Sequence, residues 1–116
     1  MVRYFYFSLS EGVVFERLVI NKGVPQMPHA RIINTEFKSK EDLELSIIAW
    51  QKWSPDNMPA SLSRYIVRTG EKSTMMTAVY ENEELLNQAQ VIAAEWWKMY
   101  GHHIYETIVF DGLVMD

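Results

Sequence analysis

Alternating apolar and polar positions, rich in β-branched and aromatic residues, predict the strands of this chain. The six predicted strands are residues 2–9, 13–20, 30–37, 62–69, 72–80 and 103–110. A short turn at Ser10-Glu11-Gly12 joins the first two strands into an N-terminal hairpin, and the proline- and glycine-containing segment 21–28 follows as a loop. We therefore interpret residues 1–116 as a single domain, in which a hairpin extension (1–29) precedes the main body (30–116).

Two segments carry apolar residues at the spacing of an amphipathic helix. The first begins after Ser39, an N-cap residue followed by acids, and is expected to end at Ser54 because Pro55 disfavours helical geometry in the residue before it. The second begins after Asn82 and is expected to end at Gly101, a residue type common just past helix ends. The predicted stripe of the first helix is Leu43, Ile47 and Trp50, with Ser54 as a candidate fourth position and with Leu45 and Ile48 widening it. That of the second helix is Leu85, Leu86, Ala89, Ile92, Ala93, Trp96 and Tyr100.

From residue 30 onward the predicted order of elements is βαββαβ. This order is that of the ferredoxin-like fold, an α+β architecture in which two helices cover one face of an antiparallel sheet. A two-residue turn at Gly70-Glu71 would set the register of the central hairpin. In that register Tyr65 and Met76 share one face, and Arg64 and Arg68 share the other.

Both faces of this hairpin carry large apolar groups, although the face away from the helices of a monomer should be polar. The second face therefore needs a cover. A second copy of the chain is the simplest cover, and folding back of the N-terminal hairpin is the alternative. The sequence thus predicts a homodimer.

Composition and charge exclude several kinds of partner and chemistry. Hydrophobic residues make up 48% of the chain and charged residues 22%, which is typical of a folded protein. The net charge is −4 and no two Lys or Arg residues are adjacent, so we expect no nucleic-acid partner. The absence of cysteine rules out disulfides, thiolate catalysis and cysteine-ligated metals. No signal peptide or membrane-length apolar run occurs, so we expect a cytoplasmic protein without membrane partners.

Two stretches, TEFKSKEDLELSIIAWQ and SLSRYIVRTGEKSTMMTAVYENEELLNQ, resemble the dimeric α/β-barrel superfamily, which includes the antibiotic-biosynthesis-monooxygenase-like domains. The resemblance covers about residues 30–115. It implies that two sheets pair face to face and that a mostly apolar pocket lies between sheet and helices. The superfamily contains cofactor-free oxygenases, haem-degrading enzymes, isomerases and proteins without known activity. Because it has no invariant catalytic set, the resemblance assigns no catalytic residue.

The aromatic and methionine content predicts an apolar binding pocket. We expect Trp50 and Trp96 to line it from the helices, and Tyr65 and Met76 from the hairpin. Packing in the core is the alternative role for both tryptophans.

Four charged or titratable residues are further candidates for ligand binding. Arg64 and Arg68 lie two apart on one strand and would anchor a carboxylate or phosphate, or form salt bridges at an interface. Glu106 is a candidate buried acid or base, or else the partner of an arginine such as Arg64 or Arg31. His103 follows His102 in a strand, so their side chains are expected on opposite faces and unable to share a metal ion.

Three functions fit these observations. The leading one is binding of a small apolar molecule, with a fatty acid or an aromatic metabolite as candidates. The second is a cofactor-independent monooxygenase-like enzyme, and the third is a non-catalytic structural or interaction protein. No cofactor and no metal site is predicted, and no nucleophile motif or glycine-rich phosphate loop occurs.

Overall fold

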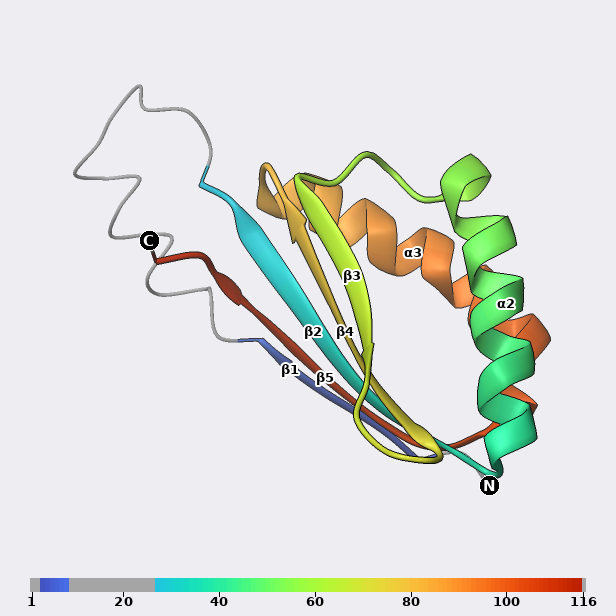
Figure 1. Ribbon diagram of the computed structural model, residues 1–116. Coiled ribbons are helices and arrows are strands. Elements are labelled where there is room, and N and C mark those ends of the chain that lie inside the picture. Colours follow the sequence, from blue (N-terminus) through green and yellow to red (C-terminus); the bar gives the residue numbers. More distant parts are fainter. Residues whose placement is uncertain (1–2, 9–26, 116) are drawn as a thin grey trace.

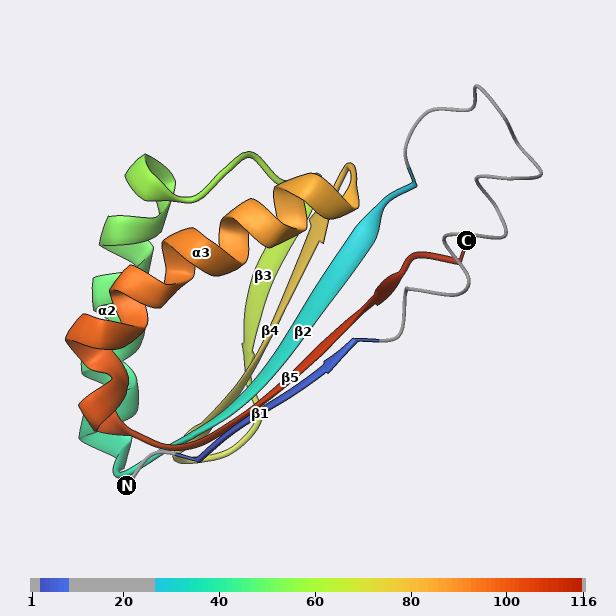
Figure 2. The same cartoon turned by 180° about the vertical axis from the view of Figure 1, so that it is seen from behind.

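A computed structural model describes residues 3–8 and 27–115, the first of these segments as backbone only. Five strands form one sheet in the order β1-β5-β2-β4-β3, and both helices lie on the same face of it (Figures 1 and 2). The elements are β1 (Arg3–Ser8), β2 (His29–Phe37), α2 (Lys40–Asn57), β3 (Ser63–Arg68), β4 (Ser73–Tyr80), α3 (Glu83–Tyr100), a 3₁₀ turn η1 (Gly101–His103) and β5 (Ile104–Leu113).

The pairs β5–β2, β2–β4 and β4–β3 are antiparallel, and the order of elements from β2 onward is βαββαβ. The predicted ferredoxin-like α+β fold is therefore confirmed. The strand β1 extends the sheet by pairing parallel with β5, from Arg3 opposite Glu106 to Ser8 opposite Asp111. The rest of the predicted N-terminal hairpin, including its second strand at 13–20, lies outside the described residues.

Helix α2 begins where the sequence predicts, because the hydroxyl of Ser39 accepts a hydrogen bond from the N–H of Asp42 at 3.0 Å. It ends at Asn57 and not at Ser54, so Pro55 lies inside its last turn. A proline there removes only one N–H donor, and the N–H of Met58 still closes the helix on the carbonyl of Ser54 at 2.9 Å. The buried face follows the predicted stripe, but it is widened at Ser46 and not at Leu45 and Ile48. It contains Leu43, Ser46, Trp50 and Ser54, whereas Leu45 and Ile48 are about half exposed.

Helix α3 begins at the predicted cap, where Asn82 accepts a hydrogen bond from the N–H of Leu85 at 2.8 Å. Its buried residues are Leu86, Ala89, Ala93 and Trp96. Gly101 follows the last turn as predicted, but its φ of −59° is right-handed. The chain therefore continues into the turn η1 without using the conformational freedom of glycine.

The register of the β3–β4 hairpin differs by one residue from the prediction. Strand β3 ends at Arg68 and β4 begins at Ser73, so Arg68 lies opposite Thr74 and the loop is longer than two residues. Side chains alternate between the two faces along a strand. A shift of one residue in the pairing therefore moves every side chain of one strand to the other face, relative to its partner strand. Met76 now shares the helix-facing side with Ile66, and Tyr65 points away from the helices.

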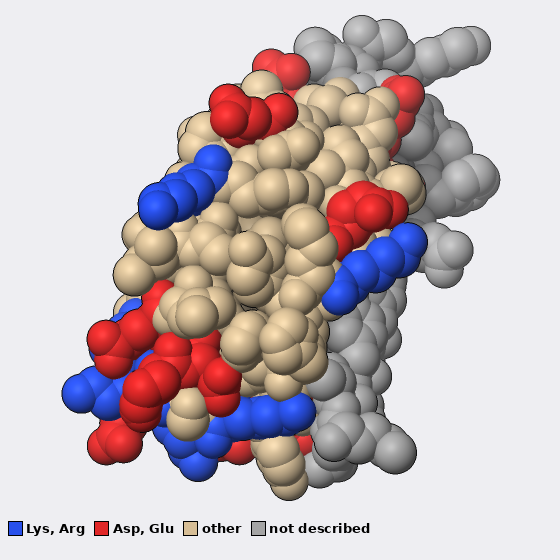
Figure 3. Space-filling model, turned by 90° about the vertical axis from the view of Figure 1, so that its right-hand side faces the viewer, with Lys and Arg blue, Asp and Glu red and all other residues tan. Residues whose placement is uncertain are grey.

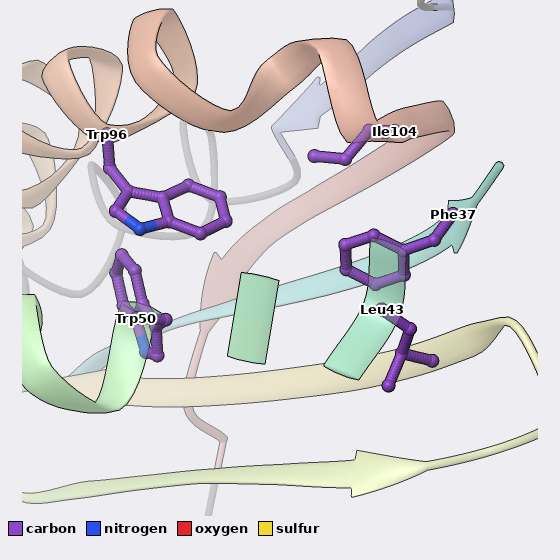
Figure 4. Close-up of a cluster of buried hydrophobic side chains, with 5 residues drawn as sticks. All are labelled: Phe37, Leu43, Trp50, Trp96 and Ile104. Carbon is purple, nitrogen blue, oxygen red and sulfur yellow. The ribbon is translucent and has the colours of Figure 1, made fainter. Parts of the chain in front are cut away.

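Apolar side chains occupy both faces of the sheet. On the helix side, Phe37, Leu43, Trp50, Trp96 and Ile104 form one buried cluster (Figure 4). On the opposite side, Ile32, Tyr65 and Val67 are 37%, 51% and 42% exposed. This second set of side chains, called the outer face below, shows that the expectation of two apolar faces holds despite the shifted register.

Candidate functional site

A cavity of about 630 Å³ lies between the helix-facing side of the sheet and the two helices. Its volume falls within the range of small-molecule sites, roughly 300–1,000 Å³. The walls include three tryptophans, Trp50, Trp96 and Trp97, and two methionines, Met58 and Met76. The cavity is thus lined mainly by apolar and polarizable side chains.

Aromatic rings form one end of the cavity. The rings of Trp50 and Trp96 meet edge to face, with centroids 5.3 Å apart and an interplanar angle of 86°. Trp96 also stacks on Tyr100 at 5.1 Å and meets Trp97 edge to face at 5.5 Å. The Nε1–H of Trp96 is buried and has no hydrogen-bond partner within the part of the chain that the structure describes. In Figure 4 it lies on the side of the ring that faces Trp50.

A buried ion pair lies farther along the cavity wall. Arg31 on β2 donates through Nε and Nη2 to the two carboxylate oxygens of Asp111 on β5, at 2.8 and 2.9 Å. Its Nη2 also donates to the amide oxygen of Gln90 on α3 at 3.2 Å. The arginine and aspartate side chains are only 7% and 3% exposed. The pair therefore ties the sheet to α3 and leaves little net charge at this end of the cavity.

Three threonines cross the middle of the sheet on the same side as the cavity. Thr35 on β2 lies opposite Thr74 on β4 and opposite Thr107 on β5. All three are at most 7% exposed, and Thr35 and Thr74 line the cavity. We call Thr107, Thr35 and Thr74 the threonine row.

The structure brings together three of the sequence-predicted binding residues, because Trp50, Trp96 and Met76 all line the cavity. Tyr65 does not, since the shifted register places it on the outer face. Neither Arg64 nor Arg68 is part of the lining.

The guanidinium of Arg64 donates to the carbonyl of Pro59 at 3.1 Å and to the hydroxyl of Tyr80 at 3.4 Å. That of Arg68 donates to the carbonyls of Gly70 and Glu71 in the hairpin loop, at 3.2 and 2.7 Å. The contacts of Arg68 lie in the hairpin loop, whereas Arg64 reaches the hydroxyl of Tyr80, a cavity-lining residue, without lining the cavity itself.

His103 lies outside the cavity and connects η1 to α2. Its Nδ1 is 2.7 Å from a carboxylate oxygen of Asp42. The hydrogen bonds from His103 and Ser39 lower the pKa of Asp42 below its usual value of 3.8. His102 and His103 are not on opposite faces of a strand as expected, because η1 precedes β5 and brings their rings to 3.9 Å. His102 lines the cavity.

Glu106 lies opposite Glu36 and belongs to the side of the sheet away from the helices. It is not part of the cavity lining, and the carboxylate beside Arg31 is that of Asp111. The register shift between Glu36 and Phe37 places Ile104 on the helix side, so Ile104 and Glu106 lie on opposite faces of the sheet.

No group of three or more His, Cys, Asp and Glu residues within 3–8 and 27–115 could hold a metal ion. In the same residues, no helix is long and apolar enough to cross a membrane. The side of the molecule shown in Figure 3 carries charges of both signs mainly near its edges and one end, around a largely uncharged centre. This surface has no extended patch of one sign that would attract a polyion.

Sequence reasoning missed the threonine row and the pairing of Arg31 with Asp111. Alternation along a strand predicts which side chains share a face with Thr35, Thr74 or Thr107 within its own strand. Only the order of the strands in the sheet brings these three threonines together. Arg31 and Asp111 are 80 positions apart, so no local pattern connects them.

No family model matches this chain, and no curated protein does. Solved structures do match, at low sequence identity. A dimeric ferredoxin-like protein from an uncultured marine organism has a TM-score of 0.64 and 16% identity, covering 78% of this chain and 90% of the other. A conserved Bacteroides thetaiotaomicron protein of unknown function, described as a possible oxidoreductase, has a TM-score of 0.59 and 12% identity over 78% and 100% of the two chains.

A variant of SnoaB, a cofactor-independent oxygenase from Streptomyces nogalater, matches with a TM-score of 0.56 and 10% identity, covering 77% of this chain and 92% of the other. At such identities the matches establish the fold. The chain has a ferredoxin-like fold, in agreement with the order of elements in its sequence.

Proposed function

We propose that this protein binds a small, mostly apolar molecule with an aromatic ring in the cavity between its sheet and helices. The observation that carries the proposal is a cavity of about 630 Å³ with Trp50, Trp96 and Trp97 in its wall. Flat aromatic walls favour ring ligands, which gain offset or edge-to-face contacts of about 0.5–1.5 kcal/mol beyond burial of area.

An aromatic metabolite fits this cavity better than a fatty acid. A fatty acid needs a cationic anchor for its carboxylate, and Arg64 and Arg68 do not line the cavity. The cations that do line it are Arg31, which is bound to Asp111, and Lys98, which is 3.4 Å from Glu95. The wall thus offers ring surfaces more readily than a carboxylate site.

The test is co-purification of a ligand followed by blocking of the cavity. Native mass spectrometry of the gently purified protein should detect a bound small molecule. Substitution of Ala93, a lining residue of α3, by Phe should fill the cavity and abolish this species. The matched control is Val91→Phe, because Val91 is 72% exposed on the same helix and the added ring there meets solvent. A ligand that persists in a folded Ala93→Phe variant contradicts the proposal.

We propose that two chains pair through their outer faces to form a homodimer. Ile32, Tyr65 and Val67 expose apolar surface on the side of the sheet that lacks helices, which supports this arrangement (Figures 1 and 2). Tyr65→Glu should shift sedimentation equilibrium toward monomer at micromolar concentration. Leu45→Glu, on the half-exposed side of α2, should leave the assembly unchanged. A wild-type protein that sediments as a monomer refutes the pairing.

The second candidate function is cofactor-independent oxygenation of an aromatic substrate in the same cavity. It is favoured by the likeness of the fold to SnoaB, which is described as a cofactor-independent oxygenase. Oxygen uptake should then rise on addition of anthrone, and Ala93→Phe should suppress that rise. Binding without oxygen uptake would favour a non-catalytic binding protein, and the absence of binding would favour a structural role.

A further inference from the structure

The threonine row lies across the floor of an otherwise apolar region. Thr107, Thr35 and Thr74 belong to three adjacent strands, and neighbouring strands are about 4.8 Å apart, so the row is about 10 Å long. The next side chains along this face of β2 and β5 are those of Phe37 and Ile104, which belong to the buried cluster that also contains Trp50 and Trp96. The row is thus a hydroxyl-bearing strip between apolar surfaces.

Valine would fill these positions with nearly the same shape and without a polar atom. A buried hydroxyl that lacks a hydrogen-bond partner costs free energy, because it loses its bonds to water and gains none. The hydroxyl of Thr107 is in this situation, since it is fully buried and has no partner among the described residues. Thr35 and Thr74 direct their side chains to the cavity, where a ligand or water can reach them.

We propose that Thr35 and Thr74, the two members of the threonine row that line the cavity, are its polar recognition site, and that they hydrogen-bond a carbonyl or hydroxyl oxygen carried by the ring of the ligand. This inference rests on the proposed binding function and specifies its chemistry. A hydroxyl both donates and accepts, so the row accommodates either kind of oxygen. A bare hydrocarbon at the same place would displace water from Thr35 and Thr74 without replacing its hydrogen bonds.

The geometry assigns different tasks to the two parts of the cavity. The edge-to-face tryptophans Trp50 and Trp96 contact the ring, while the row fixes its orientation through the oxygen. A ligand without the oxygen would leave the threonine hydroxyls buried and without hydrogen-bond partners. This penalty discriminates between ligands more strongly than apolar contacts alone.

The test compares two probes that differ in one group, 1-naphthol and 1-methylnaphthalene. Binding is followed by NMR titration of the four indole N–H resonances of the tryptophans. The variants are Thr35→Val and Thr74→Val, which change the row. The matched control is Thr77→Val, because Thr77 lies on the same strand as Thr74 but on the opposite face of the sheet.

Loss of one hydrogen bond should weaken binding of 1-naphthol about five-fold in Thr35→Val and in Thr74→Val. Binding of 1-methylnaphthalene should change less than about two-fold in these variants, and Thr77→Val should alter neither affinity. Circular dichroism and the thermal midpoint verify that each variant is folded.

Equal affinities of all variants for 1-naphthol would overturn the role of the row while leaving the cavity as a binding site. Equal weakening of both probes in Thr35→Val and Thr74→Val would also overturn it, because the effect would then be one of packing. If the wild-type protein binds neither probe, the ring-binding cavity itself is refuted.

Discussion

Removal of one partner of the buried ion pair should destabilise the protein far more than removal of both. In Asp111→Leu, the guanidinium of Arg31 remains almost fully buried and loses two short hydrogen bonds of 2.8 and 2.9 Å. Breaking such a pair typically costs about 3–5 kcal/mol. The total stability of a domain is about 5–15 kcal/mol, so this single change removes a large share of it.

The double variant Arg31→Met/Asp111→Leu replaces the pair by apolar side chains of similar size. It should recover most of the lost stability, because neither charge then remains in the low-dielectric interior. The interaction free energy from the double-mutant cycle should therefore exceed about 2 kcal/mol. Urea unfolding at one fixed protein concentration, followed by tryptophan fluorescence, measures all four proteins, since Trp50 and Trp96 are buried.

Additive effects in this cycle would refute the reasoning. They would mean that Arg31 and Asp111 each contribute through other contacts, and that their mutual pairing adds little. The variant Gln90→Leu tests the third side chain in this hydrogen-bonded group. The amide oxygen of Gln90 accepts a hydrogen bond from Arg31 at 3.2 Å. Its loss should cost about 1 kcal/mol, and a cost as large as that of Asp111→Leu would assign the main role to the contact with α3.

Three further predictions concern single sites. The hydrogen bonds from His103 and Ser39 lower the pKa of Asp42 in the folded state below 3.8. The ionised carboxylate therefore stabilises the fold above pH 3.8, and this stabilisation is lost as the pH falls through the lowered pKa. The difference in thermal midpoint between wild type and Asp42→Asn should therefore shrink below about pH 4, and a constant difference from pH 6 to pH 2 would contradict the linkage. Thr107→Val removes a buried hydroxyl that has no partner among residues 27–115 and should raise the free energy of unfolding by about 1 kcal/mol; a loss of stability in urea unfolding would show that the hydroxyl has a partner in solution. Gly101→Ala should stabilise by about 0.4–1 kcal/mol, because φ is −59° and a Cβ there meets no atom within 4 Å; a lower thermal midpoint would show that the turn needs glycine.

Local signals account for the parts of the fold that were correctly predicted. Ser39 and Asn82 cap the two helices with their own side chains, and such caps act within three residues. The predicted end of α2 at Ser54 was wrong, because the effect of Pro55 on the helix depends on where in the last turn the proline lies. The hairpin register was wrong because the loop between Arg68 and Ser73 is longer than the two residues that Gly70-Glu71 favours.

The candidate site depended more on contacts between distant segments. Trp50, Trp96 and Met76 were predicted as pocket residues from their type and helical or strand position, and all three line the cavity. The predicted place of Tyr65 in the pocket was wrong, because the one-residue shift turns its side chain to the outer face.

The sequence by itself determined the order of elements, both helix starts and the presence of apolar surface on both faces of the sheet. These features follow from periodicity and capping, which depend on neighbours within one or two turns. Only the tertiary structure decided the strand order, which brings Arg31 to Asp111 and aligns the threonine row across three strands. The physical reason is that pairing between strands joins residues far apart in the chain. Side-chain chemistry at those positions can therefore be recognised as a site only after the sheet has been assembled.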